Sequence, residues 1–522
     1  MTSSTPDVDT GGVVTYDGAP GVARAEPART SPFSAFTRPN PNRWLALAII
    51  AVAQLMVVLD ASIVNIALPS AQRDLGISDV DRQWVVTAYT LAFGGLLLLG
   101  GRIADYVGRK QIFIVGLLGF ALASAIGGIA QSSAMLFGAR ALQGAFAALL
   151  APAALSLITV TFTEPRERAR AFSVYGAIAG GGAAIGLILG GVLTEYASWR
   201  WCLLVNVPIA VATAAAALFF VTESRAQGNT KYDIPGAVLV TTGLLSLVYG
   251  FTEAAKDGVG WSASSTLSFL VLSVVLLAGF VAVELRTTHP LLPMRVVLDR
   301  NRGGSYLASL FVGAGLFSMF LFLTYYFQVN LGYSALKSGF AFLPFSAGII
   351  FTAALVSNIL PRTGPKPLMV LGSAMAAIGL YTFTFISDTS AWLTHVLPGE
   401  LLMSVGLALV FVPLSSLALL GVSRHDAGVA SAMLNTSQQI GGSLGTALLN
   451  TFYASAVTSY LASNLKSPAD LPQVQPLAFI HGYHVAFGIG VGLLTAAFIT
   501  IVVLIKADKD ELPADAGAAM AA

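Results

Sequence analysis

Apolar runs separated by short polar stretches dominate this chain of 522 residues. A helix of about 17 to 25 mostly apolar residues is long enough to cross the hydrocarbon core of a bilayer. Runs of this length recur fourteen times between charged or Gly/Pro-rich breaks, so the pattern predicts an all-α polytopic membrane protein. The predicted transmembrane helices cover residues 44–69, 84–101, 111–131, 134–160, 171–194, 202–222, 235–252, 264–284, 303–326, 339–360, 367–387, 393–420, 427–458 and 481–505.

The polar breaks group these helices into two bundles of six joined by an extra central pair. A weak internal repeat supports the division. Gly144 precedes Pro152 in the fourth helix, and Gly406 precedes Pro413 in the twelfth in a similar way. Internal repeats are typical of secondary transporters. The predicted parts are a disordered cytoplasmic tail at 1–43, an N-terminal six-helix bundle at 44–222, a linker with two extra transmembrane helices at 223–302, a C-terminal six-helix bundle at 303–505 and a cytoplasmic tail at 506–522.

Composition agrees with a membrane protein and excludes several other classes. Hydrophobic residues make up 56% of the chain and charged residues only 10%, which would not keep a soluble protein of this size dispersed in water. The net charge of +2 gives no reason to expect a nucleic-acid partner. Cys202 is the single cysteine, so neither an internal disulfide nor a multi-cysteine metal site can form.

Basic residues indicate the orientation in the membrane. Cationic side chains concentrate in cytoplasmic loops, and here they gather in alternate loops and near both ends of the chain. Both termini are therefore predicted to be cytoplasmic. The longest outer loop, 459–480, contains three prolines and is expected to be irregular. Arginine outnumbers lysine, and alanine and glycine abound, which is typical of a GC-rich bacterial genome and favours a bacterial inner membrane. The outer side has only these basic residues: Arg73, Arg82, Arg200, Lys256, Lys337 and Lys466.

The turn between the second and third predicted helices has the most specific local pattern. Residues 100–110 read GGRIADYVGRK. They resemble the loop between the second and third helices of the major facilitator superfamily, G-x-L-A-D-R-x-G-R-K, with Ile103 and Tyr106 as the departures. The resemblance implies a cytoplasmic gate in which the Asp105 carboxylate contacts a helix N-terminus. A plain topogenic loop is the alternative. The motif residues are Gly101, Asp105, Gly108, Arg109 and Lys110.

Further stretches resemble the fourteen-span drug:proton antiporter family of that superfamily. Residues 59–69, LDASIVNIALP, resemble its L-D-x-T-I-V-N-V-A-L-P motif, and residues 140–144, RALQG, resemble its R-x-x-Q-G motif linked to proton coupling. The resemblance implies the major facilitator fold and a coupling role for Asp60 and Arg140. The fifth helix departs from the antiporter motif, because Leu187 stands where proline is usual. Its helix-packing glycines are Gly176, Gly180, Gly186 and Gly190.

Three charges fall inside predicted helices, each costing roughly 2.5–3.5 kcal/mol near mid-helix. Asp60, Arg140 and Glu400 lie at similar depths in the outer half, by the helical rise of about 1.5 Å per residue. This coincidence predicts one polar cavity. A static ion pair between Asp60 and Arg140 is the structural alternative, and Glu400 is equally compatible with the outer rim. The candidate substrate-cavity residues are Asn65, Gln143, Phe317, Tyr325, Glu400 and Asn435.

The functional prediction is a proton-driven exporter of bulky amphipathic organic compounds such as drugs. No Gly-x-x-x-x-Gly-Lys-Ser/Thr loop is present, so energy is expected from an ion gradient. The expected partners are a small organic substrate, protons and the lipid bilayer, with no cofactor, no metal, no nucleic acid and a monomeric state. A metabolite uptake symporter of the same fold is the alternative. From a different class, a non-transporting membrane sensor or a membrane-embedded enzyme stays open, although the five histidines are scattered.

Reporter fusions test the predicted topology. A cytoplasmic reporter fused after Lys509 should be active, and a reporter of external location inserted near Pro472 should be active as well. The measurement is enzymatic activity of paired reporters in whole cells. Reversed activities would overturn the span count or the orientation.

Overall fold

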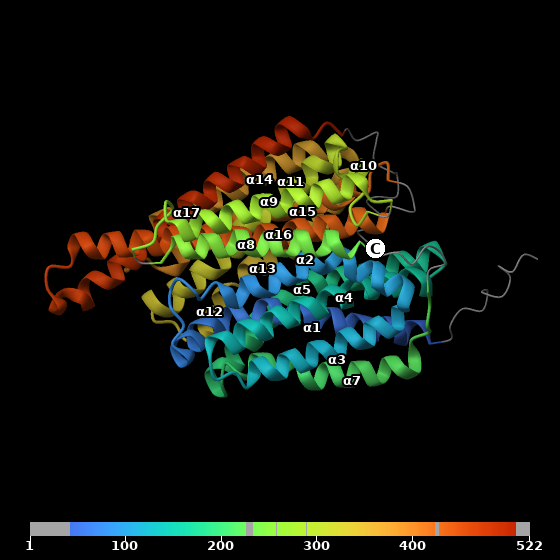
Figure 1. Cartoon of the computed structure of the whole chain (residues 1–522), viewed down its shortest axis with the longest axis horizontal. Coiled ribbons are helices and arrows are strands. Elements are labelled where there is room, and N and C mark those ends of the chain that lie inside the picture. Colours follow the sequence, from blue (N-terminus) through green and yellow to red (C-terminus); the bar gives the residue numbers. More distant parts are fainter. Residues whose placement is uncertain (1–41, 226–232, 257, 289, 423–426, 508–522) are drawn as a thin grey trace, which may run out of the picture. The chain divides into compact units, whose positions relative to one another are not determined.

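The computed structural model describes residues 42–225, 233–256, 258–288, 290–422 and 427–507, and every regular element in these ranges is a helix. Residues 41–522 group into one compact unit. Most of the predicted tails, 1–43 and 506–522, lies outside the described residues. Figure 1 shows the beginning of α1 and the end of α17 at the same end of the helical bundle.

The helices follow the predicted order along the chain. The N-terminal half holds α1 (Arg43–Leu75), α2 (Trp84–Val107), α3 (Arg109–Gly128), α4 (Ser133–Thr161), α5 (Pro165–Tyr196), α6 (Trp201–Leu204) and α7 (Asn206–Phe220). The central pair is α8 (Ile234–Ala254) and α9 (Ser264–Arg286). The C-terminal half holds α10 (Met294–Val297), α11 (Arg300–Tyr325), α12 (Ala335–Ala341), α13 (Leu343–Thr363), α14 (Pro365–Thr382), α15 (Leu397–Ala418), α16 (Ala427–Asn464) and α17 (Leu471–Leu504).

Twelve segments among the described residues are long and apolar enough to cross a membrane. The other two long helices, α5 and α16, are not among them. In α5 several side chains before Gly181 lie outside the described residues, and the apolar stretch that is left, Gly181–Tyr196, is short for a membrane span. In α16, Asn, Gln, Ser and Thr side chains interrupt the apolar pattern. The predicted all-helical membrane fold is confirmed, whereas the count of fourteen transmembrane helices is not.

The prediction of an irregular outer loop at 459–480 is wrong. Helix α16 continues to Asn464 and α17 begins at Leu471, so the two helices form a hairpin that extends beyond the rest of the bundle (Figure 1, orange to red). Ser467 and Asp470 form a capping box around the short turn, which satisfies backbone groups that would otherwise lack partners. Pro472 sits in the first turn of α17, where no intrahelical N–H is needed. The prolines at 472 and 476 are therefore accommodated within α17.

Close helix contacts at glycines assemble the N-terminal half. At Gly100 of α2, a Cβ atom would collide with the backbone of Ala148 in α4. At Gly186 and Gly190 of α5, a Cβ would run into Ser62 and Ile63 of α1. Membrane helices gain most of their association energy from such backbone approach, because lipid offers apolar side chains no worse an environment than protein does.

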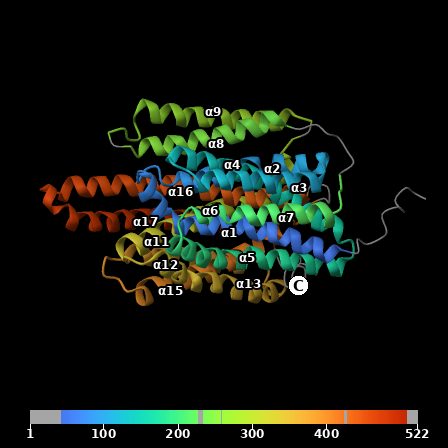
Figure 2. The same ribbon diagram turned by 90° about the horizontal axis from the view of Figure 1, so that it is seen from below.

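The central pair packs on the seam between the two halves. Helix α8 contacts α2 of the N-terminal half and α16 of the C-terminal half, and Figure 2 shows α8 and α9 together on one edge of the bundle. A hydrogen bond of 2.9 Å joins the Gln83 side-chain amide to the Thr252 hydroxyl, and the Thr451 hydroxyl donates to the Phe251 carbonyl at 2.8 Å. The pair thus touches both halves without separating them.

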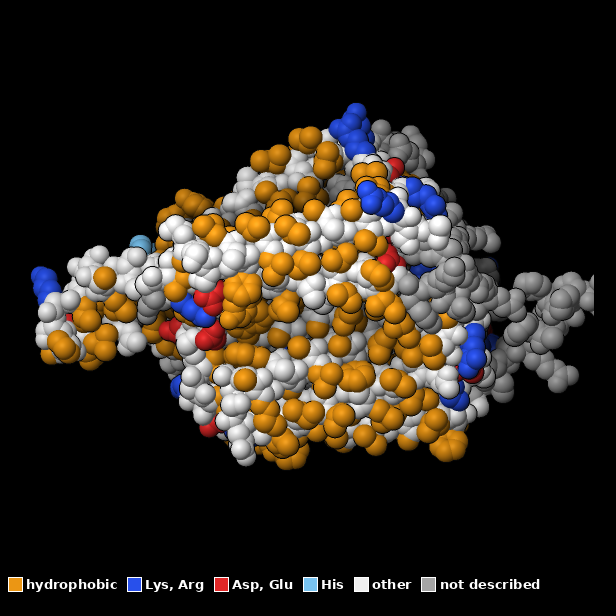
Figure 3. All heavy atoms as spheres, in the orientation of Figure 1, with side chains coloured by type: hydrophobic (Ala, Val, Ile, Leu, Met, Phe, Trp, Pro, Cys, Tyr) orange, Lys and Arg blue, Asp and Glu red, His pale blue; other side chains and the backbone are white. Residues whose placement is uncertain are grey.

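Side chains on the outside follow the expectation for a bilayer. On the face drawn in Figure 3, hydrophobic side chains cover the flank of the helices and charged side chains gather towards the two ends. Exposed Val271, Val274 and Val275 on α9 are part of this apolar exterior. In water such a surface would drive association, whereas lipid tails cover it without cost.

The Gly100 contact predicts a stability effect. Gly100→Ala should lower the free energy of unfolding by about 1–3 kcal/mol, because the added methyl has no room against α4. Gly138→Ala is the matched control, since nothing lies within 4 Å of a Cβ at that exposed helical position; it should gain up to about 1 kcal/mol from helix propensity. Unfolding of the detergent-solubilised protein measures both. Equal stability of the two variants would contradict the close contact.

Candidate functional site

Asp60 and Arg140 form an ion pair inside the N-terminal half. Asp60 lies on α1 and Arg140 on α4, each within a long apolar helix. Arg140 Nη1 lies 2.5 Å from Asp60 Oδ2, and both side chains are buried, with 2% and 0% of their surfaces exposed. An unpaired charge at this depth would be far less stable than a paired one. Each of the two buried charges therefore has the other as its counter-charge.

Two amides complete the coordination of the Asp60 carboxylate. Its Oδ1 atom accepts hydrogen bonds from Gln143 Nε2 at 3.0 Å and from Asn206 Nδ2 at 2.9 Å. Gln143 Nε2 also donates to Ser124 Oγ at 2.8 Å. Three donors from α4 and α7 therefore surround one carboxylate on α1. These donors replace the water that a carboxylate loses when it is buried.

The Arg140 guanidinium is held on more than one side. Its Nε donates to the Val85 carbonyl at 2.9 Å, and its Nη1 also reaches Gln143 Oε1 at 2.9 Å. Its Cζ lies 4.5 Å from the centre of the Tyr89 ring. The planar fork of arginine suits several fixed acceptors at once. Arg140 would thus keep partners on α2 and α4 if Asp60 became neutral.

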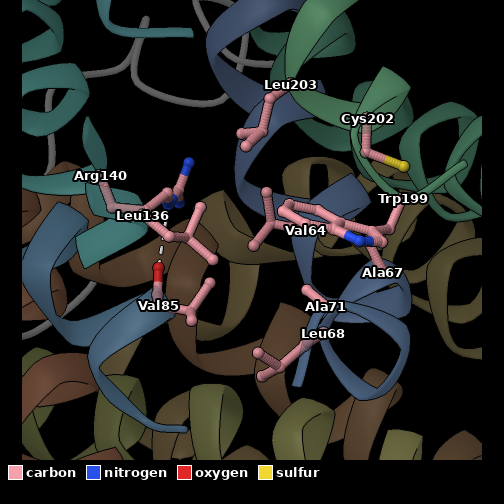
Figure 4. A pocket seen from close by; sticks show the side chains of 10 residues that line it. All are labelled: Val64, Ala67, Leu68, Ala71, Val85, Leu136, Arg140, Trp199, Cys202 and Leu203. Atoms are coloured by element: carbon pink, nitrogen blue, oxygen red, sulfur yellow. Dashed lines mark hydrogen bonds between the residues drawn. The ribbon is translucent and has the colours of Figure 1, made fainter. Parts of the chain in front are cut away.

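A small cavity adjoins Arg140. Apolar side chains such as Val64, Leu68 and Leu136 line it, with Trp199 and Cys202 on the side away from Arg140 (Figure 4). Its volume is about 10 Å³, room for about one water molecule and far below the several hundred Å³ of a typical ligand pocket. In this conformation the ion pair has a hydrophobic border and no space for a bulky ligand beside it.

The motif turn is tighter than predicted, because α2 continues to Val107 and only Gly108 separates it from α3. The backbone of Gly108 has φ +134°, which residues with a side chain rarely adopt. The Asp105 carboxylate accepts from Arg109 Nε at 2.9 Å, one helical turn away. Gly101 lies against Pro152 of α4.

Glu223, which the sequence analysis did not single out, caps the start of α3. Its carboxylate accepts from the backbone N–H groups of Lys110 and Gln111, each at 3.1 Å. The Lys110 ammonium group donates to the Leu218 carbonyl at 2.7 Å. A carboxylate at a helix N-terminus is favourable for the helix dipole. The helix N-terminus in this motif is thus capped by Glu223, whereas Asp105 pairs with Arg109.

Leu187, where the family pattern has proline, lies at the contact between the two halves. It is fully buried, and its carbonyl oxygen faces Gly339 of α12, where a Cβ would collide with it. Gly191 similarly meets Leu336. The surroundings of Gly176 and Gly180 lie outside the described side chains of α5.

The other predicted cavity residues do not gather around Asp60. Asn65 donates to the Ala61 carbonyl of its own helix, and Phe317 packs against Gly442 of α16. Tyr325 donates to Gln72 Oε1 at 2.5 Å near the outer end of α1. Asn435 is exposed on α16. Of the six, only Gln143 contacts the ion pair in the described residues.

Glu400 lies in the first turn of α15, directly after the π-helical turn Trp392–Val396. The residue is completely buried, and neither carboxylate oxygen has a hydrogen-bond partner within the described parts of the chain. An unpaired buried carboxylate is costly. Its place on a helix of the other half separates it from the hydrogen-bond network of Asp60.

Comparisons with known proteins agree with this architecture. Residues 50–446 match the family model described as Major Facilitator Superfamily. The chain is 50% identical over 470 residues to the puromycin resistance protein of Streptomyces alboniger, covering 89% of this chain and 92% of that protein. It is 39% identical over 459 residues to the cephamycin export protein of Amycolatopsis lactamdurans, covering 87% and 91%.

Solved structures show the same fold. A bacterial homologue of the human lysosomal transporter Spinster, in an inward-facing and unoccupied conformation, superposes with a TM-score of 0.62 over 89% of this chain and 98% of that chain. Sequence identity is 16%, so the likeness concerns the fold alone.

Stability measurements test the pairing of Asp60 with Arg140. Arg140→Gln should destabilise the protein by about 3–5 kcal/mol, because it leaves a buried carboxylate without its counter-charge. Adding Asp60→Asn to that variant should restore part of the loss, since no buried charge then lacks a partner. Arg73→Gln, at an exposed position on α1, is the control. The readout is the unfolding midpoint in detergent; additive losses in the double variant would contradict the pairing.

Proposed function

Because the chain belongs to the major facilitator superfamily, we propose that it is a proton-driven exporter of bulky amphipathic organic compounds such as antibiotics. Relatives named for puromycin resistance, cephamycin export, and tetracenomycin C resistance and export match more than four fifths of this chain. Each of these names refers to antibiotic resistance or export, and the chemically diverse compounds suggest a substrate defined by size and amphipathic character.

The Asp60–Arg140 pair is the single observation that carries the proposal of proton coupling. Two ionisable groups buried at 0% and 2% exposure are expensive to retain in a membrane protein unless they serve function. A proton added to Oδ2 of Asp60 would cancel the carboxylate charge and replace the contact with Arg140 Nη1. Arg140 would keep the Val85 carbonyl and Gln143 Oε1 as acceptors.

Protonation would then loosen α1 from α4 while leaving Arg140 solvated by protein groups. In a transporter whose two halves rock about a central site, such loosening would favour one of the two access states. Release of the proton on the other side would restore the pair. Proton and substrate would be exchanged across the membrane if protonation favours one access state and binding of the bulky substrate favours the other. The pair would therefore act as the coupling element, and not as a static structural contact.

The orientation proposed is that of an inner-membrane exporter with both termini cytoplasmic. The arginines and lysines of the motif turn and of residues 162–170 lie at the end where α1 begins and α17 finishes. Lys and Arg side chains gather at that end of the surface in Figure 3. The positive-inside rule assigns such an end to the cytoplasm. A monomer is proposed, since one chain supplies both halves, the coupling pair and the motif turn.

Uptake symport and enzymatic catalysis are weaker alternatives. The residues described contain no group of three or more His, Cys, Asp or Glu side chains arranged to hold a metal. Symport would use the same Asp60 pair but move substrate inward, so direction of transport separates the two. Leu187, where the antiporter motif has proline, meets Gly339 of α12 through its backbone carbonyl, which proline also has, so the replacement does not by itself favour uptake.

Proton release on addition of puromycin tests the coupling role. In purified protein in weakly buffered detergent, wild type should release a proton when puromycin binds, whereas Asp60→Asn should bind puromycin without release, because asparagine cannot ionise. Asp60→Glu should release with an altered pH profile. Arg140→Lys should retain partial release, since lysine keeps the charge without the guanidinium fork. Asp74→Asn is the matched control, because Asp74 lies on the same helix but is half-exposed and pairs with Arg200 at the outer end.

Proton-driven efflux of puromycin from cells should disappear in Asp60→Asn and persist in Asp74→Asn. An uncoupler should abolish efflux by the wild type. Unchanged proton release from a well-folded Asp60→Asn protein would remove Asp60 from the proton path and make Glu400 the next residue to test. Efflux that resists the uncoupler would overturn proton drive altogether.

A further inference from the structure

Arg82 places a second buried guanidinium outside the Asp60–Arg140 pair. It belongs to the short connection between α1 and α2, at the end opposite the motif turn, and only 2% of its side chain is exposed. From the sequence alone, Arg82 is predicted to be one basic residue of an outer loop. A charge buried this completely must be stabilised by its surroundings.

Tyrosine rings supply most of that stabilisation. Arg82 Cζ lies 3.9 Å from the centre of the Tyr325 ring and 4.5 Å from that of Tyr453. The Tyr483 ring stacks on Tyr453 with centroids 5.2 Å apart. Distances under about 6 Å are typical of cation–π attraction, which strengthens when water is excluded. We name Tyr325, Tyr453 and Tyr483 the tyrosine cage.

Polar contacts to Arg82 are fewer and longer. Its Nη1 lies 3.5 Å from Asp79 Oδ1, and its Nε donates to Asn450 Oδ1 at 3.2 Å. Its Nη2 has no hydrogen-bond partner in the described residues, and the Asp79 side chain is 45% exposed. A half-exposed carboxylate at that distance contributes little. The cage thus holds Arg82 mainly as an aromatic-bound cation.

The cation and the cage come from different halves of the protein. Arg82 and Asp79 belong to the connection after α1, whereas the cage residues lie on α11, α16 and α17. Neighbouring contacts join the same two halves: Tyr325 donates to Gln72 of α1, and Gln328 Nε2 donates to the Ile66 carbonyl at 2.9 Å. Separation of the halves at this end would withdraw Arg82 and uncover the cage.

We propose that the tyrosine cage is a binding site for an organic cation, which Arg82 occupies while the outer end is closed and vacates when it opens. The proposal rests on the exporter function above and gives that function a substrate class. Arg82 is then an internal competitor whose return to the cage displaces the departing cation. Release to the outside becomes coupled to closure.

The composition of the cage narrows the chemistry of the cation. Asp79 would leave with Arg82, because both are on the same connection, so no carboxylate from that connection remains beside the rings. Flat or quaternary cations with delocalised charge and apolar surface suit such a site, whereas a small ammonium ion would lose more hydration than the rings return. Aromatic cationic compounds are therefore the expected ligands.

Ethidium, a flat and permanently charged aromatic cation, tests the proposal with the purified full-length protein. Removal of the competitor by Arg82→Gln should tighten ethidium binding roughly tenfold, in line with the strength of desolvated cation–π contacts. Arg82→Lys, which restores a cation at this position, should stay near wild type. In the Arg82→Gln background, Tyr453→Leu should erase the gain, and Tyr453→Phe should keep it because the aromatic face remains.

Lys337→Gln is the matched control, because Lys337 Nζ also lies over a tyrosine, 3.7 Å from the centre of Tyr333, but at an exposed position. Its ethidium affinity should equal that of wild type. Arg82→Gln that binds ethidium no more tightly than wild type would overturn the proposal, as would a gain that survives Tyr453→Leu. Equilibrium binding in detergent needs no proton gradient, so loss of the coupling role of Asp60 would leave this result unaffected.

Discussion

A carboxylate buried in an apolar helix bundle is the constraint around which the N-terminal half is built. Asp60 could not remain ionised there without nearby donors, and α4 and α7 provide Arg140, Gln143 and Asn206. Because the Asp60 carboxylate must point towards these donors, the rotation of α1 about its own axis is fixed relative to α4 and α7. Under the proposed coupling, the same contacts would make the packing of α1 sensitive to one proton, because neutralising the carboxylate would remove its ion pair with Arg140. Stability and the proposed coupling therefore depend on one set of atoms.

Glycine contacts make that meeting point possible. Helix α5 reaches α1 at Gly186 and Gly190, beside the turn that holds Asp60, and α2 reaches α4 at Gly100 and Gly144. Backbones that approach this closely have little freedom to slide, so rearrangement is expected between the halves more than within them. The small cavity next to Arg140 agrees with a tightly packed half. The two halves would then move relative to each other at the surface where they meet.

The outer part of the seam combines backbone packing with a charged contact. Gly191 and Gly339 let α5 and α12 meet closely, and Leu336 N–H donates to Glu195 Oε2 at 3.0 Å. Arg82 in the tyrosine cage lies in the same interface between halves. Asp60 in the middle of α1 and Arg82 beyond its outer end would thus respond to two different events, proton binding and closure. Helix α1 and the connection that follows it link them.

The hydrophobic pattern alone determined the helical membrane fold, because apolar runs of bilayer length admit few other structures. The sequence also placed Asp60 and Arg140 at one depth, where opposite charges can pair, but it placed Glu400 there too, and Glu400 lies in the other half without a partner among the described residues. The sequence did not reveal the roles of Glu223 and Arg82, nor the helical hairpin at 459–480. Glu223 follows α7 in the chain yet caps α3. Arg82 precedes α2 yet lies in the tyrosine cage, whose rings come from α11, α16 and α17. Such partners are distant along the chain, so only tertiary packing decided which charges became buried and which stayed at the surface.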